Sequence, residues 1–133
     1  KGHAMYDILK DSAMRFFKKP WFQRFAEKEG ITDAALKSLV KGMEEGRINA
    51  DLGGFVYKQR LAREGGGKSR GYRALLFYRK GDRVFFAFGF AKSDQANISR
   101  RDLVILKAEA QLLMECAEDA LDKMARNGML VEF

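Results

Sequence analysis

Apolar residues recur at helical spacing in three parts of the chain. Pro20 suits the first turn of a helix, where its missing N–H costs nothing, and an apolar stripe beginning with Trp21 follows it. Thr32 is a suitable N-cap for a second amphipathic helix. A longer apolar stripe starts after Ser99, which together with Asp102 resembles a capping box. The pattern predicts two N-terminal helices that pack on a sheet, and one long C-terminal helix.

Between these helical segments the apolar period falls to two, which indicates strands. Residues 54–90 predict a three-stranded antiparallel meander, with a glycine-rich loop at 63–70 and a tight turn at 80–83. Residues 84–90 are aromatic enough for a central strand that is buried on both faces. Residues 129–133 either add a terminal strand or pack on a partner. The predicted class is α+β: a small twisted antiparallel sheet, with possible edge strands beside the meander, packed with helices.

The composition predicts a single globular domain without a membrane span. The chain has 133 residues, of which 47% are hydrophobic and 32% charged. No apolar run approaches the roughly 18–20 residues of a membrane helix, and no secretory signal is visible. Residues 1–4 resemble a cloning remnant ahead of Met5, so we expect one domain over 5–133. We expect the cytosol as its compartment.

The residue types also limit the available chemistry. Cys116 is the one cysteine, which excludes an internal disulfide and a cysteine-based zinc site. The only histidine, His3, lies in the expected remnant, so histidine triads and histidine metal sites are excluded too. We therefore expect neither a metal nor a cofactor, and any chemistry must use Lys, Arg, Tyr, Asp or Glu.

The positive charge is concentrated in one short segment. The chain has a formal net charge of +7, and residues 57–80 carry eight basic groups against one acidic group. Three tyrosines interleave this segment: Tyr57, Tyr72 and Tyr78. Such concentration is typical of a protein that binds a polyanion, although a solvated basic face is the alternative. The eight basic residues are Lys58, Arg60, Arg63, Lys68, Arg70, Arg73, Arg79 and Lys80.

Three of these cations have the spacing of a phosphate clamp. Lys58 and Arg60 are two residues apart on one predicted strand, so both project from the same face. Arg73, on the next strand, shares that face if the register matches. Three cations on adjacent strands can stabilise the charge that develops when a phosphate is attacked. The alternative is a set of surface charges that bind phosphate without chemistry.

Three stretches of the sequence resemble the RelE/HigB family of bacterial toxins, in the RelE/ParE superfamily of type II toxin–antitoxin systems. They are residues 53–63 with the pattern K-x-R-L-A-R, 67–73 with GKSxGYR, and 88–93 with GFAK. The resemblance extends roughly over Met5–Leu113. It implies a twisted antiparallel sheet with helices at its side. It also implies a ribosome-dependent endoribonuclease that cleaves mRNA in the ribosomal A site by metal-free attack of a ribose 2′-OH, and a cognate antitoxin that neutralises it.

The resemblance also implies roles for individual residues. Lys58 matches a lysine proposed as general base, Arg60 matches a residue that stabilises the transition state, and Arg73 matches a phosphate-binding arginine. The remaining candidates for nucleic-acid contacts are Arg63, Lys68, Arg70, Tyr72, Arg79 and Lys92.

The sequence departs from well-studied relatives at the position of the general acid. Ser93 stands where they have an arginine, and Ser99 stands close to the place of a tyrosine. Arg63, Lys68 and Tyr72 are alternatives for the role of protonating the leaving group. Two other functions stay open for this reason: a non-catalytic protein that binds RNA or the ribosome, and a ParE-like toxin that targets gyrase.

An antitoxin is expected to cover the basic groove or to displace the final helix. The apolar tail at residues 129–133 is a candidate antitoxin contact, and its packing on the domain's own sheet is the alternative.

Overall fold

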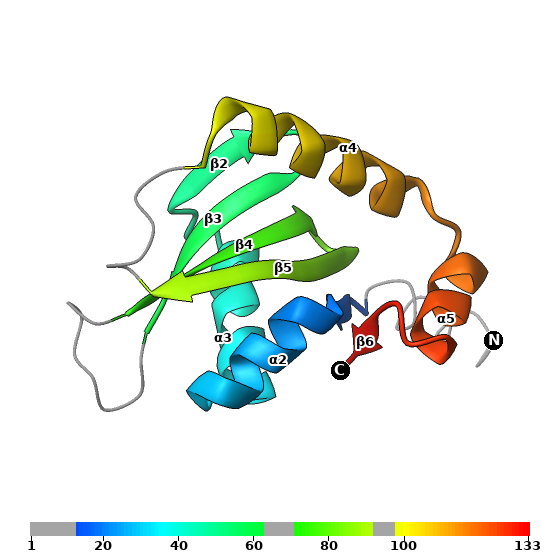
Figure 1. The fold of residues 1–133 in the computed structure, drawn as a ribbon, viewed down its shortest axis with the longest axis horizontal. Helices are drawn as coiled ribbons and strands as arrows, with labels where there is room; N and C mark the ends of the chain where they lie inside the picture. The colour runs from blue at the N-terminus through cyan, green and yellow to red at the C-terminus, as the bar shows by residue number, and fades with distance from the viewer. Residues whose placement is uncertain (1–12, 63–70, 92–97) are drawn as a thin grey trace, which may run out of the picture.

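A computed structural model of the chain describes residues 13–62, 71–91 and 98–133, so the expected remnant at 1–4 lies outside these ranges. A six-stranded sheet in the order β2-β3-β4-β5-β1-β6 forms the middle of the molecule. Helices α2 and α3 pack on one face, and α4 and α5 cover the other (Figure 1). The elements are β1 (Arg15–Lys18), α2 (Pro20–Glu29), α3 (Asp33–Glu44), β2 (Ala50–Gly53), β3 (Val56–Leu61), β4 (Tyr72–Arg79), β5 (Arg83–Ala91), α4 (Arg100–Glu115), α5 (Glu118–Arg126) and β6 (Val131–Glu132).

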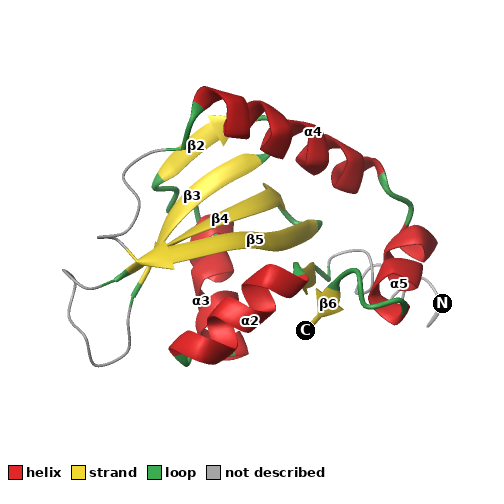
Figure 2. Ribbon diagram, viewed as in Figure 1, coloured by secondary structure: helices red, strands yellow, loops and turns green. Residues whose placement is uncertain are grey.

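The predicted α+β class and the predicted meander are confirmed. Strands β3, β4 and β5 are antiparallel neighbours in the centre of the sheet (Figure 2). Strand β2 extends the sheet beside β3, and β1 and β6 extend it beyond β5. The β1–β5 pair is parallel, which makes the sheet mixed rather than purely antiparallel. A hairpin fixes the direction of adjacent strands, but β1 and β5 are far apart in sequence, so no turn dictates how they pair.

The helix starts follow the local signals in the sequence. Pro20 occupies the first helical position of α2. The Thr32 hydroxyl accepts a hydrogen bond from the backbone N–H of Ala35 and caps α3. The Ser99 hydroxyl accepts one from the backbone N–H of Asp102 and caps α4. The predicted N-caps are therefore confirmed, and each satisfies a donor that the first helical turn leaves unpaired.

The expected single C-terminal helix is in fact two helices. Cys116 and Ala117 are extended, with ψ of 135° and 158°, and separate α4 from α5. Arg83 is 5% exposed, and its guanidinium donates hydrogen bonds to the carbonyl groups of Leu113 and Cys116 and pairs with Glu118 at 2.8 Å. This buried cation binds carbonyl groups at the end of α4 and an acidic residue at the start of α5, so it stabilises the break.

The C-terminal tail packs on the domain's own sheet. Strand β6 pairs antiparallel with β1, and Leu130 is 4% exposed in the core. The ring of Phe133 packs against those of Phe16 and Phe86, with centroids 5.8 and 6.1 Å apart. Only Met129 presents a large exposed apolar side chain in this segment. The structure therefore favours the packing alternative for residues 129–133.

We expect Arg83→Leu to lower the free energy of unfolding by about 2–3 kcal/mol, because two carbonyl groups and Glu118 lose a buried charged donor. Arg47→Leu is the matched control, since Arg47 pairs with Glu45 on the surface and an exposed pair contributes about 0–1 kcal/mol. Urea denaturation followed by circular dichroism measures both variants. Equal losses would mean that Arg83 contributes no more than a surface pair.

Candidate functional site

Lys58, Arg60 and Arg73 lie together on the α4 face of the sheet, and we call these three residues the basic strip. Arg60 on β3 pairs directly with Arg73 on β4, and Lys58 lies two residues from Arg60 on the same strand. Directly opposite residues point to the same face with Cβ atoms about 5 Å apart. The register that the clamp required is therefore confirmed.

The basic strip has no neutralising carboxylate partner within residues 13–62, 71–91 and 98–133. Among the residues that the structure describes, none of the three strip cations takes part in an ion pair. By contrast, Arg15, Arg79 and Arg83 each pair with at least one carboxylate. Like charges placed directly opposite destabilise a sheet, so the Arg60–Arg73 pair costs stability unless an anion lies between the two guanidinium groups. Such an arrangement is typical of a site that binds a phosphate.

Side-chain hydrogen bonds hold the exposed end of the strip. Strand β2 pairs with β3 only as far as Lys58. Beyond it, the Gln59 side chain, 2% exposed, accepts from the backbone N–H of Asn49 at 2.7 Å and donates to the Arg47 carbonyl. The Asn49 side chain in turn accepts from the backbone N–H of Arg60 at 2.7 Å. These bonds replace a neighbouring strand and fix the backbone from which Arg60 projects.

The tyrosines that interleave the basic segment lie on the opposite face. Tyr57, Tyr72 and Tyr78 all pack with the α2/α3 core. The Tyr72 hydroxyl donates to Glu29, and the Tyr78 hydroxyl donates to Glu44. Burial raises the pKa of Tyr57 and of Tyr78, and the bond to Glu44 raises that of Tyr78 further. The structure does not bring Tyr72 to the strip, either as an RNA contact or as a general acid.

The other predicted site residues lie away from the basic strip or outside the residues that the structure describes. Arg79 lies at the far end of β4, six residues from Arg73 and so about 20 Å away, where its guanidinium pairs with Asp82. Ser99 caps α4. The predicted residues outside the described ranges are Arg63, Lys68, Arg70, Lys92 and Ser93.

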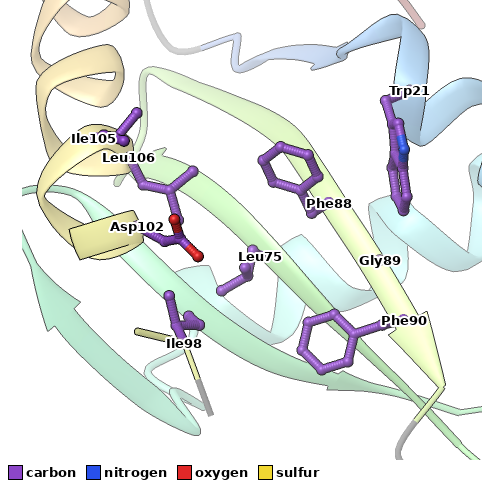
Figure 3. Close-up of a pocket in the computed structure, with 9 residues that line it drawn as sticks. All are labelled: Trp21, Leu75, Phe88, Gly89, Phe90, Ile98, Asp102, Ile105 and Leu106. Carbon is purple, nitrogen blue, oxygen red and sulfur yellow. The ribbon is translucent and has the colours of Figure 1, made fainter. Parts of the chain in front are cut away.

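An apolar pocket of about 480 Å³ opens beside the basic strip. Leu75, Phe88 and Phe90 form its floor on β4 and β5 (Figure 3). The sheet register joins this floor to the strip, because Leu75 lies opposite Lys58 and Phe90 lies opposite Arg73. Strip and pocket are thus two parts of one surface on the α4 face.

Two walls enclose this pocket on either side of the floor. Trp21 from α2 forms one wall, and Asp102 and Ile105 from α4 form the other (Figure 3). The Trp21 ring meets that of Phe88 edge-on, with centroids 5.3 Å apart, and stacks on Phe25 at 5.7 Å. Trp21 is nevertheless 41% exposed. The sequence pattern placed it in an apolar helix stripe and did not reveal that it borders a pocket.

A β-bulge places the aromatic residues in the pocket. Between the pairs that Leu75 and Leu76 make with β5, the register shifts by one residue, leaving Ala87 as the extra residue. Phe88 therefore joins Ala87 on the α4 side, where Phe90 also packs. Gly89 faces α2, where an added Cβ would lie 2.3 Å from the Phe25 ring. The bulge and this glycine together let α2 approach the sheet while two phenylalanines line the pocket.

The described part of the chain has neither a membrane-spanning helix nor a cluster of metal-ligating side chains. No helix within 13–62, 71–91 and 98–133 is long and apolar enough to cross a membrane. The same ranges contain no group of three or more His, Cys, Asp and Glu side chains placed to hold a metal ion.

The fold and the site define a small basic α+β protein with an unneutralised cationic strip beside an aromatic pocket. Residues 14–133 match the family described as the RelE toxin of the RelE/RelB toxin–antitoxin system. The chain therefore belongs to the RelE toxin family, which confirms the resemblance found in the sequence. Membership implies a cognate RelB-type antitoxin as its partner. No curated protein matches the chain.

We expect Gly89→Ala to destabilise the protein by about 1–3 kcal/mol, because the new methyl group overlaps the packed Phe25 ring. Phe25→Leu removes that overlap, so the double variant should lose less stability than the sum of the two single variants. Thermal or urea unfolding of all four proteins measures the coupling. Strict additivity would show that Gly89 and Phe25 do not constrain each other.

Proposed function

We propose that this protein is a ribosome-dependent endoribonuclease that cleaves mRNA and is held inactive by its cognate antitoxin. The observation that carries the proposal is the basic strip, in which three cations from two adjacent strands lack carboxylate partners in the described structure. In a toxin of the RelE family, such a site fits an RNA phosphate.

The proposed reaction is attack of a ribose 2′-OH on the adjacent phosphorus. The new O–P bond forms as the bond to the 5′-oxygen breaks, and the departing 5′-oxygen takes a proton from water, which leaves a 2′,3′-cyclic phosphate and a 5′-hydroxyl. Lys58 takes the role of accepting the 2′-OH proton, and the guanidinium groups of Arg60 and Arg73 stabilise the extra negative charge on the phosphate oxygens. Planar arginine groups suit this role because each can donate two parallel hydrogen bonds to a phosphate.

A non-catalytic RNA- or ribosome-binding protein is the second candidate. It is favoured by the lack of an evident proton donor for the leaving group among the described residues. Ser99 stands near the position of a tyrosine in relatives, and Tyr72 is buried on the other face of the sheet. A strip that binds phosphate without a proton donor would hold RNA and leave it intact. The two candidates differ in whether cut products appear.

The test is primer extension on a reporter mRNA in a cell-free translation reaction that contains the purified protein. We expect cuts within codons that require translating ribosomes, and a roughly 100-fold or larger loss of cutting in Arg73→Ala, the typical effect of removing one group that stabilises the transition state. Arg24→Ala removes the same charge from an exposed position on α2 and should cut like the wild type.

Intact mRNA under verified translation would contradict the endoribonuclease, and co-sedimentation with ribosomes would then identify the non-catalytic alternative. Cutting by Arg73→Ala at the wild-type rate would separate the activity from the basic strip. A DNA-damage response in cells without mRNA cuts would point to the gyrase alternative instead.

A further inference from the structure

One charged side chain, that of the exposed residue Asp102, borders the apolar pocket. The Asp102 carboxylate points from α4 toward Leu75, into the space between the α4 wall and Trp21 (Figure 3). Its backbone N–H is bonded to Ser99, but its carboxylate makes no hydrogen bond or ion pair with any described residue. Asp102 is exposed, so solvent and the dipole of α4 stabilise its charge, and its unpaired oxygens can accept hydrogen bonds from a ligand in the pocket.

The aromatic lining defines what the pocket can accept. Trp21 is partly exposed, and the half-buried Phe88 and Phe90 add two further rings to the pocket lining. Unpaired RNA bases are bound by stacking on aromatic side chains and by hydrogen bonds to their base-pairing edges. The pocket volume of about 480 Å³ lies within the range of small-molecule sites.

Resting on the function proposed above, we propose that this pocket binds one nucleobase of the RNA whose phosphate lies on the basic strip, and that Asp102 selects the base. The pocket floor is continuous with the strip through the Lys58–Leu75 and Arg73–Phe90 pairs. A phosphate on the strip therefore places a neighbouring base beside the pocket.

The chemistry of a carboxylate favours guanine at this position. An ionised aspartate only accepts hydrogen bonds, through two oxygens. Guanine presents two adjacent donors on its base-pairing edge, the ring N1–H and the exocyclic amino group, so it pairs with both oxygens of Asp102. Adenine and cytosine each present a donor beside an acceptor, and the acceptor repels the second carboxylate oxygen. Uracil has one donor between two acceptors.

Asp102→Asn reverses this preference with almost no change in shape. An asparagine side chain offers one acceptor and one donor, which matches adenine or cytosine better than guanine. Asp119→Asn is the matched control, because Asp119 is an exposed acidic residue in the first turn of α5, and α5 does not line the pocket.

Trp21 provides a direct readout because it is the only tryptophan in the chain. The probes are four short RNA oligonucleotides that differ in one base and carry 2′-deoxyribose at the attacked position, so that they bind but cannot be cut. We expect the guanine probe to quench Trp21 fluorescence with an affinity at least about tenfold higher than the others, the discrimination typical of a two-bond contact. Asp102→Asn should lose that preference and Asp119→Asn should keep it.

Binding without cleavage separates this inference from the proposed function. Arg73-dependent mRNA cutting together with quenching that does not depend on the base, or that is unchanged in Asp102→Asn, would overturn the role of Asp102 while the endoribonuclease stands. Guanine-selective quenching in a protein that cuts no mRNA would support the nucleobase pocket and contradict the proposed endoribonuclease activity. A Trp21 signal that responds to the antitoxin and to none of the four probes would overturn the nucleobase pocket in favour of a protein-docking site.

Discussion

The site depends on a one-residue register shift between β4 and β5. Side chains alternate between the two faces of a strand, so one extra residue reverses the direction of everything that follows it. Ala87 is that extra residue, and beyond it Phe88 and Phe90 face α4 while Gly89 faces α2. Without the shift, the two large rings would lie between the sheet and α2. The bulge thus permits close packing of α2 on one face and builds an aromatic floor on the other.

Arginine has two opposite roles on this sheet. Arg83 is buried, and its two terminal guanidinium nitrogens bind carbonyl groups at the end of α4 and the carboxylate of Glu118 in α5. Arg60 and Arg73 lie directly opposite each other, with no carboxylate partner in the described structure. The first arrangement stabilises the fold, whereas the second destabilises it through repulsion. A protein retains such repulsion where an anionic ligand can relieve it, because residues that break a local rule of stability gather at functional sites.

The helix caps, the meander and the basic strip could be predicted from the sequence because each is encoded locally. Thr32 and Ser99 cap helices through contacts three residues away, and the positions of Lys58, Arg60 and Arg73 follow from strand periodicity. The remaining features are set by residues distant in sequence. The end of α4 depends on Arg83, thirty or more residues earlier, and a bulge carries no signal in a strand that is apolar on both faces. The pocket could not be predicted for the same reason, because its two walls come from helices that are far apart in the sequence.

The position of the basic strip at one end of β3 reconciles two requirements: the cations must be exposed, and the backbone that carries them must be hydrogen-bonded. A cation that binds RNA must reach solvent, yet the strand that carries it needs partners for its backbone groups. A second full strand beside Arg60 would satisfy that backbone and also narrow the approach to the side chain. The chain instead ends the β2–β3 pairing at Lys58 and bonds the next N–H groups through Gln59 and Asn49. Gln59 is buried, so its hydrogen bonds are shielded from water, while Arg60 remains exposed at the end of β3 where the pairing with β2 has stopped.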